Sequence, residues 1–261
     1  MTMSLLSDYE DRTRWKYEMI RGYFHTHDGL IRKVNHEGCY VPFPGTTVVF
    51  GLEYTGIKLL TEVQQNLYER LRDTGMLAAR LPASTFHMTL HDLISPEQCT
   101  CDPSDQERYI REMTDSLDQA VPIARAIQSE FAGQRISMRP DRIINMVSKS
   151  LVMLLKPGTE RDYENLLEMY ERFQSVVKIP YPFTPHVTLA YYRPGMLDGD
   201  RVGKAVGEIQ MDIDSWPDLF LRPEQLTVQT FLDMQHYLDA PIEAGSREVV
   251  IDREQMDSPP F

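Results

Sequence analysis

The chain has 261 residues, of which 42% are hydrophobic and 25% are charged, a balance that can fill the core of one large domain or of two small lobes. Because tight binding of long nucleic acid depends on clustered lysine and arginine, the formal net charge of −12 disfavours extended nucleic acid and favours a small nucleotide or a short oligonucleotide as substrate. The three cysteines are too few, and odd in number, for a disulfide framework.

The amino-terminal residues predict no membrane attachment. Residues 1–12, MTMSLLSDYEDR, lack the basic start and the apolar core of a signal peptide. No apolar run in the chain approaches the ~20 residues needed to span a membrane. We therefore expect a cytoplasmic protein without a membrane partner, and nothing in the sequence predicts a protein partner.

Residues 1–44 are expected to form an extension that precedes the main domain. A helix is predicted from near the amino terminus to about Gly22. Short hairpins should follow, with turns at Asp28-Gly29 and near residue 37, because these positions carry turn-forming residues.

Residues 45–235 contain the same order of elements twice, a buried strand, an amphipathic helix and a second strand. The first set is predicted at 46–52, 57–75 and 84–93, and the second at 150–158, 159–173 and 181–192. Aligned, the two final strands read T-F-H-M-T-L at 85–90 and T-P-H-V-T-L at 184–189. This internal duplication predicts two lobes related by a pseudo-twofold axis.

The remaining segments predict further helices and strands. Between the two halves, a helix over 105–131 should be kinked or divided by Pro122, and a strand with a turn should follow over 133–147. After the second half, a helix over 198–210 and a last strand over 224–234 are expected. Residues 236–261 form a carboxy-terminal segment and tail.

The repeated His-x-Thr pattern places polar groups on one side of each strand. Because side chains alternate along a strand, His87 shares a face with Thr89, and His186 shares a face with Thr188. If the twofold axis brings these faces together, two imidazoles and two hydroxyls surround one small volume. One imidazole can accept a proton while the other donates one, and the hydroxyls can donate to a phosphate. No metal ion or cofactor is required, and the sequence does not assign which histidine is the acid.

The paired H-x-T strands and the strand–helix units before them resemble the two-histidine (2H) phosphoesterase superfamily over about residues 45–235. That superfamily includes RNA and nucleotide 2′,3′-cyclic phosphodiesterases, 2′,5′-oligoadenylate phosphodiesterases and an enzyme that trims RNA 3′ ends. The resemblance implies a bilobal α+β fold with antiparallel sheets flanking a central cleft. It also implies that His87 and His186 are catalytic and that Thr89 and Thr188 bind the phosphate.

Five further residues are candidates for substrate contacts. By alternation, His91 and Tyr192 should lie on the same faces as His87 and His186, four and six residues further along their strands. Arg193 could help to neutralise a phosphate where the second strand ends. Tyr40 and Phe43, in the extension, could fold over the cleft and stack on a base.

Two other functions remain open from the sequence. The segment FHTHDG contains His25 and His27, which resemble the opening ligands of a metal-dependent phosphoesterase. Alternatively, the cleft could bind a nucleotide without hydrolysing it, as a sensor.

Two spacings that suit zinc are disfavoured: His87 and His91 stand ~13 Å apart on a strand at ~3.3 Å per residue, and Cys99-x-Cys101 has no second pair.

Overall fold

Two four-stranded antiparallel sheets form the centre of the molecule, and the computed structural model describes residues 4–16 and 21–240. The strands are β1 (Tyr23–His25), β2 (Gly45–Gly51), β3 (His87–Asp92), β4 (Ile136–Met146), β5 (Ser150–Pro157), β6 (His186–Tyr191), β7 (Met196–Asp198), β8 (Leu219–Leu221), β9 (Leu226–Phe231) and β10 (Tyr237–Asp239). The first sheet has the order β10-β9-β2-β3 and the second the order β6-β5-β4-β8, while β1 pairs with β7.

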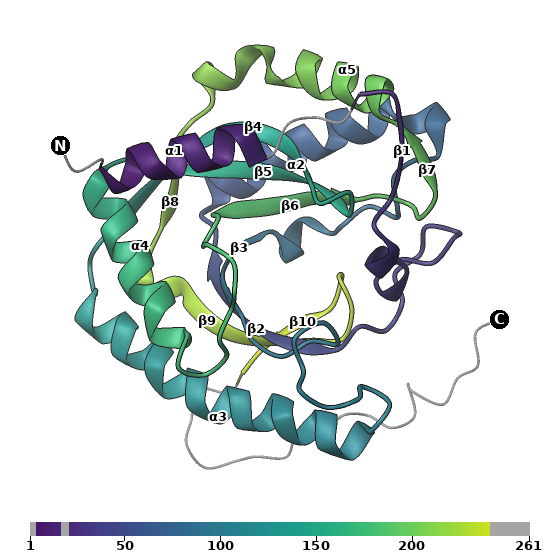
Figure 1. Cartoon of the computed structure of the whole chain (residues 1–261). Helices are drawn as coiled ribbons and strands as arrows, with labels where there is room; N and C mark the ends of the chain where they lie inside the picture. The colour runs from purple at the N-terminus through teal and green to yellow at the C-terminus, as the bar shows by residue number, and fades with distance from the viewer. Residues whose placement is uncertain (1–3, 17–20, 241–261) are drawn as a thin grey trace.

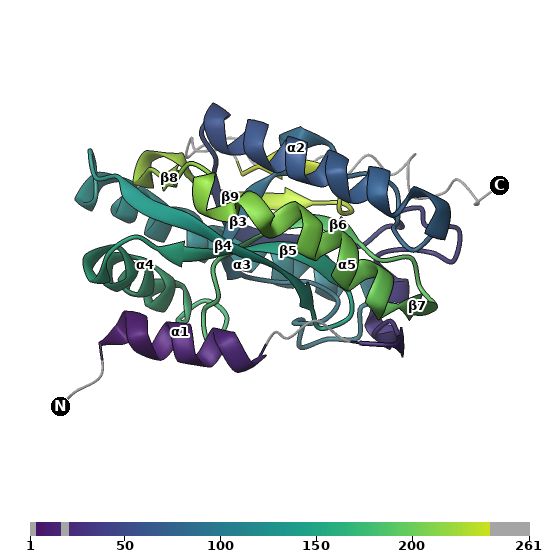
Figure 2. The ribbon, with the colours of Figure 1, turned by 90° about the horizontal axis from the view of Figure 1, so that it is seen from above.

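Helices lie on the outside of the two sheets (Figure 1). They are α1 (Leu5–Lys16), α2 (Tyr54–Arg70), α3 (Gln106–Glu130), α4 (Glu160–Phe173) and α5 (Gly199–Ile209). Figure 2 shows α1 and α2 on opposite sides of β4 and β5. The predicted α+β fold, with antiparallel sheets and outer helices, is confirmed. Within residues 4–16 and 21–240, no helix is both long and apolar enough to cross a membrane.

Helices of each half pack on the sheet of the other half. Helix α2 follows β2 in the first half, yet it contacts β6 and β8 of the second sheet, whereas α4 of the second half contacts β3 of the first sheet as well as β5 of its own. The amide of Gln64 in α2 donates a hydrogen bond to the carbonyl of Leu189 at 2.9 Å. Because each half covers the sheet of the other, the two halves share one hydrophobic core, which includes Leu60, Met88 and Val187.

Matching strand registers support the predicted duplication. In the first sheet Gly51 pairs with His87, and in the second Leu154 pairs with His186. Each pair of strands also contains a β-bulge at the same place, two to three residues after the histidine. The two halves therefore agree in backbone geometry as well as in sequence, although their helices and loops differ in length.

Three local predictions differ from the structure. Pro122 lies inside α3, on the exposed side of the helix, and does not divide it. The predicted turn within 133–147 is a β-bulge beside Pro140 in a continuous β4. Asp28 and Gly29 begin a 3₁₀ helix, not a hairpin turn. Part of the first predicted helix, at 17–20, and the tail from 241 onwards fall outside the described residues.

Candidate active site

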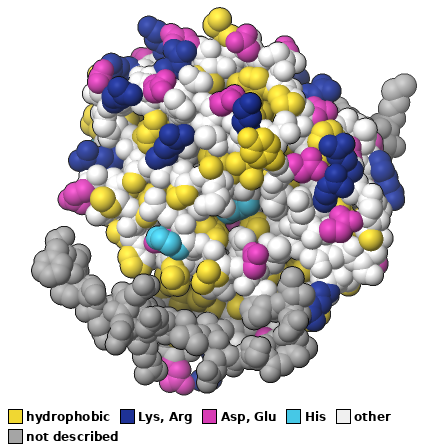
Figure 3. All heavy atoms as spheres, turned by 180° about the vertical axis from the view of Figure 1, so that it is seen from behind, with side chains coloured by type: hydrophobic (Ala, Val, Ile, Leu, Met, Phe, Trp, Pro, Cys, Tyr) yellow, Lys and Arg dark blue, Asp and Glu magenta, His cyan; other side chains and the backbone are white. Residues whose placement is uncertain are grey.

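The two motif strands are the adjoining edges of the two sheets. Strand β3 ends the first sheet and β6 ends the second, and the two contact each other. The imidazoles of His87 and His186 are close enough for the positive charge of one to lower the pKa of the other. Figure 3 shows histidine side-chain atoms in a hollow near the middle of one face, surrounded mostly by uncharged groups. The structure thus brings the two predicted catalytic histidines to one site.

The equivalent β-bulges decide which side chains face this site. In β3 the register shifts after Thr89, and in β6 after Thr188. Each bulge adds one residue, so the alternation of faces reverses beyond it. Both strands show the same burial pattern, with the first, third and sixth residues half-buried and the others buried. The sixth residues, Asp92 and Tyr191, therefore share the face of the histidines.

Backbone carbonyls orient both imidazoles in the same way. Nδ1 of His186 lies 2.7 Å from the carbonyl oxygen of Thr184, and His87 makes the equivalent hydrogen bond to the carbonyl of Thr85. A carbonyl only accepts, so Nδ1 of His186 must carry a hydrogen. Its Nε2 is then the nitrogen that loses or gains a proton, as general acid–base catalysis requires.

Burial keeps both imidazoles neutral near pH 7. Burial lowers the pKa of His87 to about 4, and the positive charge of His186 contributes to this shift. Burial also lowers the pKa of His186. The carboxylate of Asp92 opposes the shift at both histidines, because a negative charge stabilises an imidazolium. Asp92 is held in place by Tyr181, whose hydroxyl donates a hydrogen bond to it at 3.0 Å.

The predicted phosphate-binding residues also face the site. Thr89 and Thr188 are half-buried at equivalent positions of β3 and β6. The hydroxyl of Thr188 is within hydrogen-bonding reach of the Tyr191 hydroxyl, which also donates to the sulfur of Met234 at 3.1 Å. The site therefore offers two hydroxyls beside two imidazoles.

His91 and Tyr192 do not reach the site, contrary to the sequence prediction. His91 is 1% exposed, and its ring centre lies 4.9 Å from that of Tyr170 in α4. Tyr192 is fully buried and packs edge-on against Phe24, with ring centres 5.9 Å apart. The bulges explain both errors, since simple alternation assigns every later residue in the strand to the wrong face.

Phe43 is also unable to stack on a base. It is 2% exposed, its ring is stacked on Phe231 with centres 6.3 Å apart, and the ammonium of Lys33 lies 4.6 Å from the ring centre. Tyr40 contacts a residue that faces the site, because its ring packs edge-on against the ring of Tyr191. Its hydroxyl donates a hydrogen bond to the carbonyl of Ala79.

Arg193 and the remaining candidate ligands lie elsewhere. Arg193 is exposed and donates from Nε to the carbonyl of His36, so it binds the extension to the end of β6. His25 is exposed, and Nδ1 of His27 accepts a hydrogen bond from the Gly29 amide. Among the residues that the structure describes, no three histidine, cysteine, aspartate or glutamate side chains gather as a metal site would require.

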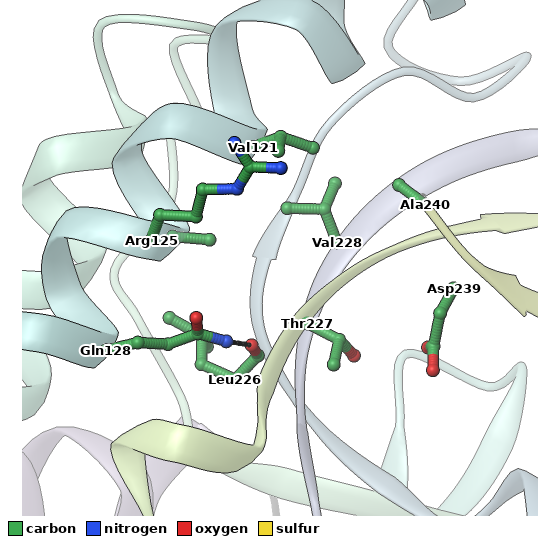
Figure 4. A pocket seen from close by; sticks show the side chains of 9 residues that line it. Val121, Arg125, Gln128, Leu226, Thr227, Val228, Asp239 and Ala240 are labelled. Carbon is green, nitrogen blue, oxygen red and sulfur yellow. Dashed lines mark hydrogen bonds between the residues drawn. The ribbon is translucent and has the colours of Figure 1, made fainter. Parts of the chain in front are cut away.

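Two cavities differ greatly in size. The larger, about 170 Å³, lies beside His87 and is bounded by β2, β9 and β10. The smaller, about 20 Å³, lies between α3 and β9, where Val228 points toward Val121 (Figure 4). It is little larger than the ~10–15 Å³ that one water molecule requires. Of these two cavities, the larger has room for part of a substrate.

Comparison with known proteins establishes similarity of fold. No family model matches the chain, and no curated protein shows significant similarity to it. A conserved protein of unknown function from Agrobacterium tumefaciens, ATU0111, is similar in structure, with a TM-score of 0.60 and 18% identity over 83% of this chain and 93% of that chain.

A weaker structural similarity is to LigT from Escherichia coli in its apo form, with a TM-score of 0.37 and 10% identity over 77% of this chain and 96% of that chain. The similarity to ATU0111 shows the fold alone, so chemistry must be inferred from the side chains of the site.

Proposed function

We propose that this protein is a 2H-type phosphodiesterase that hydrolyses a 2′,3′-cyclic phosphate or a related 2′-linked nucleotide without a metal ion. The observation that supports this most is the convergence of His87 and His186 from the edges of two sheets. Binding alone does not require two proton-transfer groups. Their pairing with two hydroxyls, Thr89 and Thr188, on the same face fits hydrolysis of a phosphodiester better than a sensor function.

The reaction would use one histidine in each protonation state. A neutral imidazole takes a proton from water while the water oxygen forms a bond to phosphorus. The bond from phosphorus to the ribose oxygen breaks, and a protonated imidazole gives its proton to that oxygen. The threonine hydroxyls would donate to the non-bridging oxygens, where negative charge develops. Because the charge of His186 lowers the pKa of His87 and the repulsion between two positive charges is mutual, the pair favours a state with one proton, which either histidine can carry.

Hydrolysis assays on a panel of nucleotides test this proposal. The panel contains 2′,3′-cyclic nucleotides, 3′,5′-cyclic nucleotides and 2′,5′-linked oligoadenylate, each incubated with and without EDTA. We expect turnover of a 2′,3′-cyclic or 2′,5′-linked compound that is unchanged by EDTA. Activity abolished by EDTA would instead favour a metal-dependent enzyme using His25 and His27. Binding by calorimetry without turnover of any compound would favour a nucleotide sensor.

The pH dependence of kcat/KM tests whether the reaction needs one protonated and one neutral histidine. Since the pKa values of His87 and His186 both lie below 6.5 in the free protein, we expect a bell-shaped profile with both limbs on the acid side of pH 6.5. The acid limb should lie near pH 4, where both imidazoles become protonated and neither can act as the base. A flat profile between pH 5 and pH 9 would contradict a mechanism with paired histidines.

Replacement of Asp92 should move this profile in a defined direction. Because its negative charge raises the pKa of both imidazoles, Asp92→Asn should shift both limbs toward lower pH. Asp115→Asn is a matched control, since Asp115 is exposed on α3. If Asp92→Asn changed the rate equally at every pH, Asp92 would act on the site by some route other than charge.

A further inference from the structure

Helix α1 of the extension is fixed to the second half of the molecule. It lies beside α4 and contacts it (Figure 2). The backbone amides of Leu5 and Leu6, in its first turn, donate hydrogen bonds to the carboxylate of Glu160. Tyr9 is 1% exposed, and its hydroxyl donates to the carbonyl of Leu155 in β5 at 2.8 Å. The helix therefore has a defined position against the sheet that contains β6.

Arg12 reaches from this helix to the residues just before β6. Its Nη2 donates a hydrogen bond to the carbonyl of Phe183 at 2.9 Å, and its Nη1 donates to the hydroxyl of Thr184 at 3.0 Å. The guanidinium also lies over the ring of Tyr9, with Cζ 5.3 Å from the ring centre. Because hydrogen bonds from a charged donor are stronger than neutral ones, Arg12 binds these two consecutive residues firmly to α1.

Thr184 is the residue whose carbonyl orients His186. Nδ1 of the imidazole lies 2.7 Å from that carbonyl oxygen. Arg12 binds the side chain of the same residue and the carbonyl of the peptide group that precedes it. The direction of the Thr184 carbonyl depends on both of these groups, so Arg12 acts on the imidazole through one intervening residue.

The segment that Arg12 binds has no regular structure of its own. Residues 178–185 lie in neither a helix nor a strand. Pro182 and Pro185 carry no amide hydrogen, so they cannot donate to a neighbouring strand. Contacts from other parts of the chain must therefore fix this segment. Arg12 supplies two of them, and the amide of Leu155 supplies another by donating to the carbonyl of Pro185.

The first half of the molecule orients its histidine differently. The carbonyl that orients His87 belongs to Thr85, which ends a 3₁₀ helix at Ala83–Thr85. The amide and the hydroxyl of Thr85 both donate to the carbonyl of Pro82, at 3.0 and 2.8 Å. Local contacts thus fix the first carbonyl, whereas the second depends on a side chain 172 residues earlier in the chain.

We propose that Arg12 is a positioning residue for the reaction, because it fixes the Thr184 carbonyl that holds the imidazole of His186 in its productive orientation. This inference rests on the proposed function for the catalytic role of His186. It gives the amino-terminal extension a part in catalysis, although α1 contributes no group that touches the substrate.

A first test removes the guanidinium and keeps its apolar stem. Arg12→Met should lower kcat for a 2′,3′-cyclic nucleotide about 10-fold, which is part of the 10²–10⁴-fold that a general acid or base contributes. KM should change less, because Thr89 and Thr188 are unaltered. Arg12→Lys should recover some of the loss, since an ammonium can bind one of the two acceptors but lacks the forked geometry of a guanidinium.

Nitrogen-15 NMR of the imidazoles tests positioning without an assay of activity. In the wild-type protein at neutral pH, His186 should be protonated on Nδ1 alone, because a carbonyl can only accept. In Arg12→Met we expect a mixture of both tautomers at His186, while His87 keeps a single tautomer because Thr85 is held by local contacts. A general loss of stability would not alter one imidazole and spare the other.

Thr184→Val is a second variant, and it leaves α1 unchanged. It removes the hydroxyl that accepts from Arg12, so kcat should again fall. Because the two residues act through one contact, the double variant with Arg12→Met should lose less than the product of the two single losses. Arg14→Met, at an exposed position of the same helix, is the matched control and should keep the wild-type rate.

The outcomes separate this inference from the proposed function. A single, unchanged tautomer at His186 in both Arg12→Met and Thr184→Val would overturn the inference, whatever the rates. Losses that multiply in the double variant would also contradict it, because the two residues would then act independently. A mixture of tautomers at His186 in Arg12→Met, in a protein that hydrolyses no cyclic nucleotide, would support positioning by Arg12 and overturn the proposed function.

Discussion

Replacing either His87 or His186 with alanine is expected to lower kcat/KM for a 2′,3′-cyclic nucleotide by about 10²–10⁴-fold, the usual contribution of a general acid or base. Each imidazole is positioned by a carbonyl two residues earlier in the chain, so neither can take over the role of the other. The measurement is initial rate under kcat/KM conditions, with the folded state of each variant checked by its melting temperature.

The double variant and a surface control sharpen this test. Because both proton transfers belong to one reaction, His87→Ala and His186→Ala together should be only slightly slower than the slower single variant, not the product of the two losses. His36→Ala should retain the full rate, since His36 is exposed and bonds to Arg193 through its backbone. Near-normal rates in both single variants would exclude paired-histidine catalysis.

Much of the fold could be predicted because the signals for it are local. The apolar alternation of β3 and β6 and the helical spacing in α2 and α4 are properties of short segments. The duplication could be recognised because both copies keep histidine and threonine two residues apart. Together with an assumed twofold axis, these patterns predicted that His87 and His186 lie at one site.

The bulges in β3 and β6 could not be predicted, and they account for the largest error in the site. A bulge arises from hydrogen bonding to the neighbouring strand, and neither Leu90 nor Leu189 is a residue type that marks one. Without the bulge, alternation places His91 in the cleft. With it, His91 enters the core and Asp92 takes its place.

Contacts between distant segments of the chain also could not be predicted from the sequence. Tyr181 binds Asp92 across 89 residues, and Tyr237 meets His87 from the opposite end of the chain. Neither tyrosine stands out by spacing or by neighbours. The packing of α2 and α4 on the sheet of the other half likewise depends on tertiary contacts, because an amphipathic helix indicates that one face is buried but not which sheet covers it.

Removing either threonine hydroxyl is expected to have the second-largest effect on activity. Thr89→Val and Thr188→Val keep the branched shape of the side chain at equivalent positions of β3 and β6 but remove a hydrogen-bond donor. If these hydroxyls stabilise charge that develops on the phosphate oxygens, each loss should lower kcat by about 10²–10³-fold, as for other oxyanion donors. KM should change less, because the bond strengthens mainly in the transition state.

The division of the effect between kcat and KM distinguishes this role from simple substrate binding. If Thr188→Val raised KM with kcat unchanged, the hydroxyl would bind the ground state and the transition state equally. Thr114→Val is a suitable control, because the Thr114 hydroxyl donates to the carbonyl of Ile110 within α3, on another element than the site. Tyr191→Phe should have an effect between those of Thr188→Val and the Thr114→Val control. Since its hydroxyl is within reach of Thr188, we expect a smaller loss than for Thr188→Val, caused by poorer alignment of the threonine hydroxyl with the phosphate.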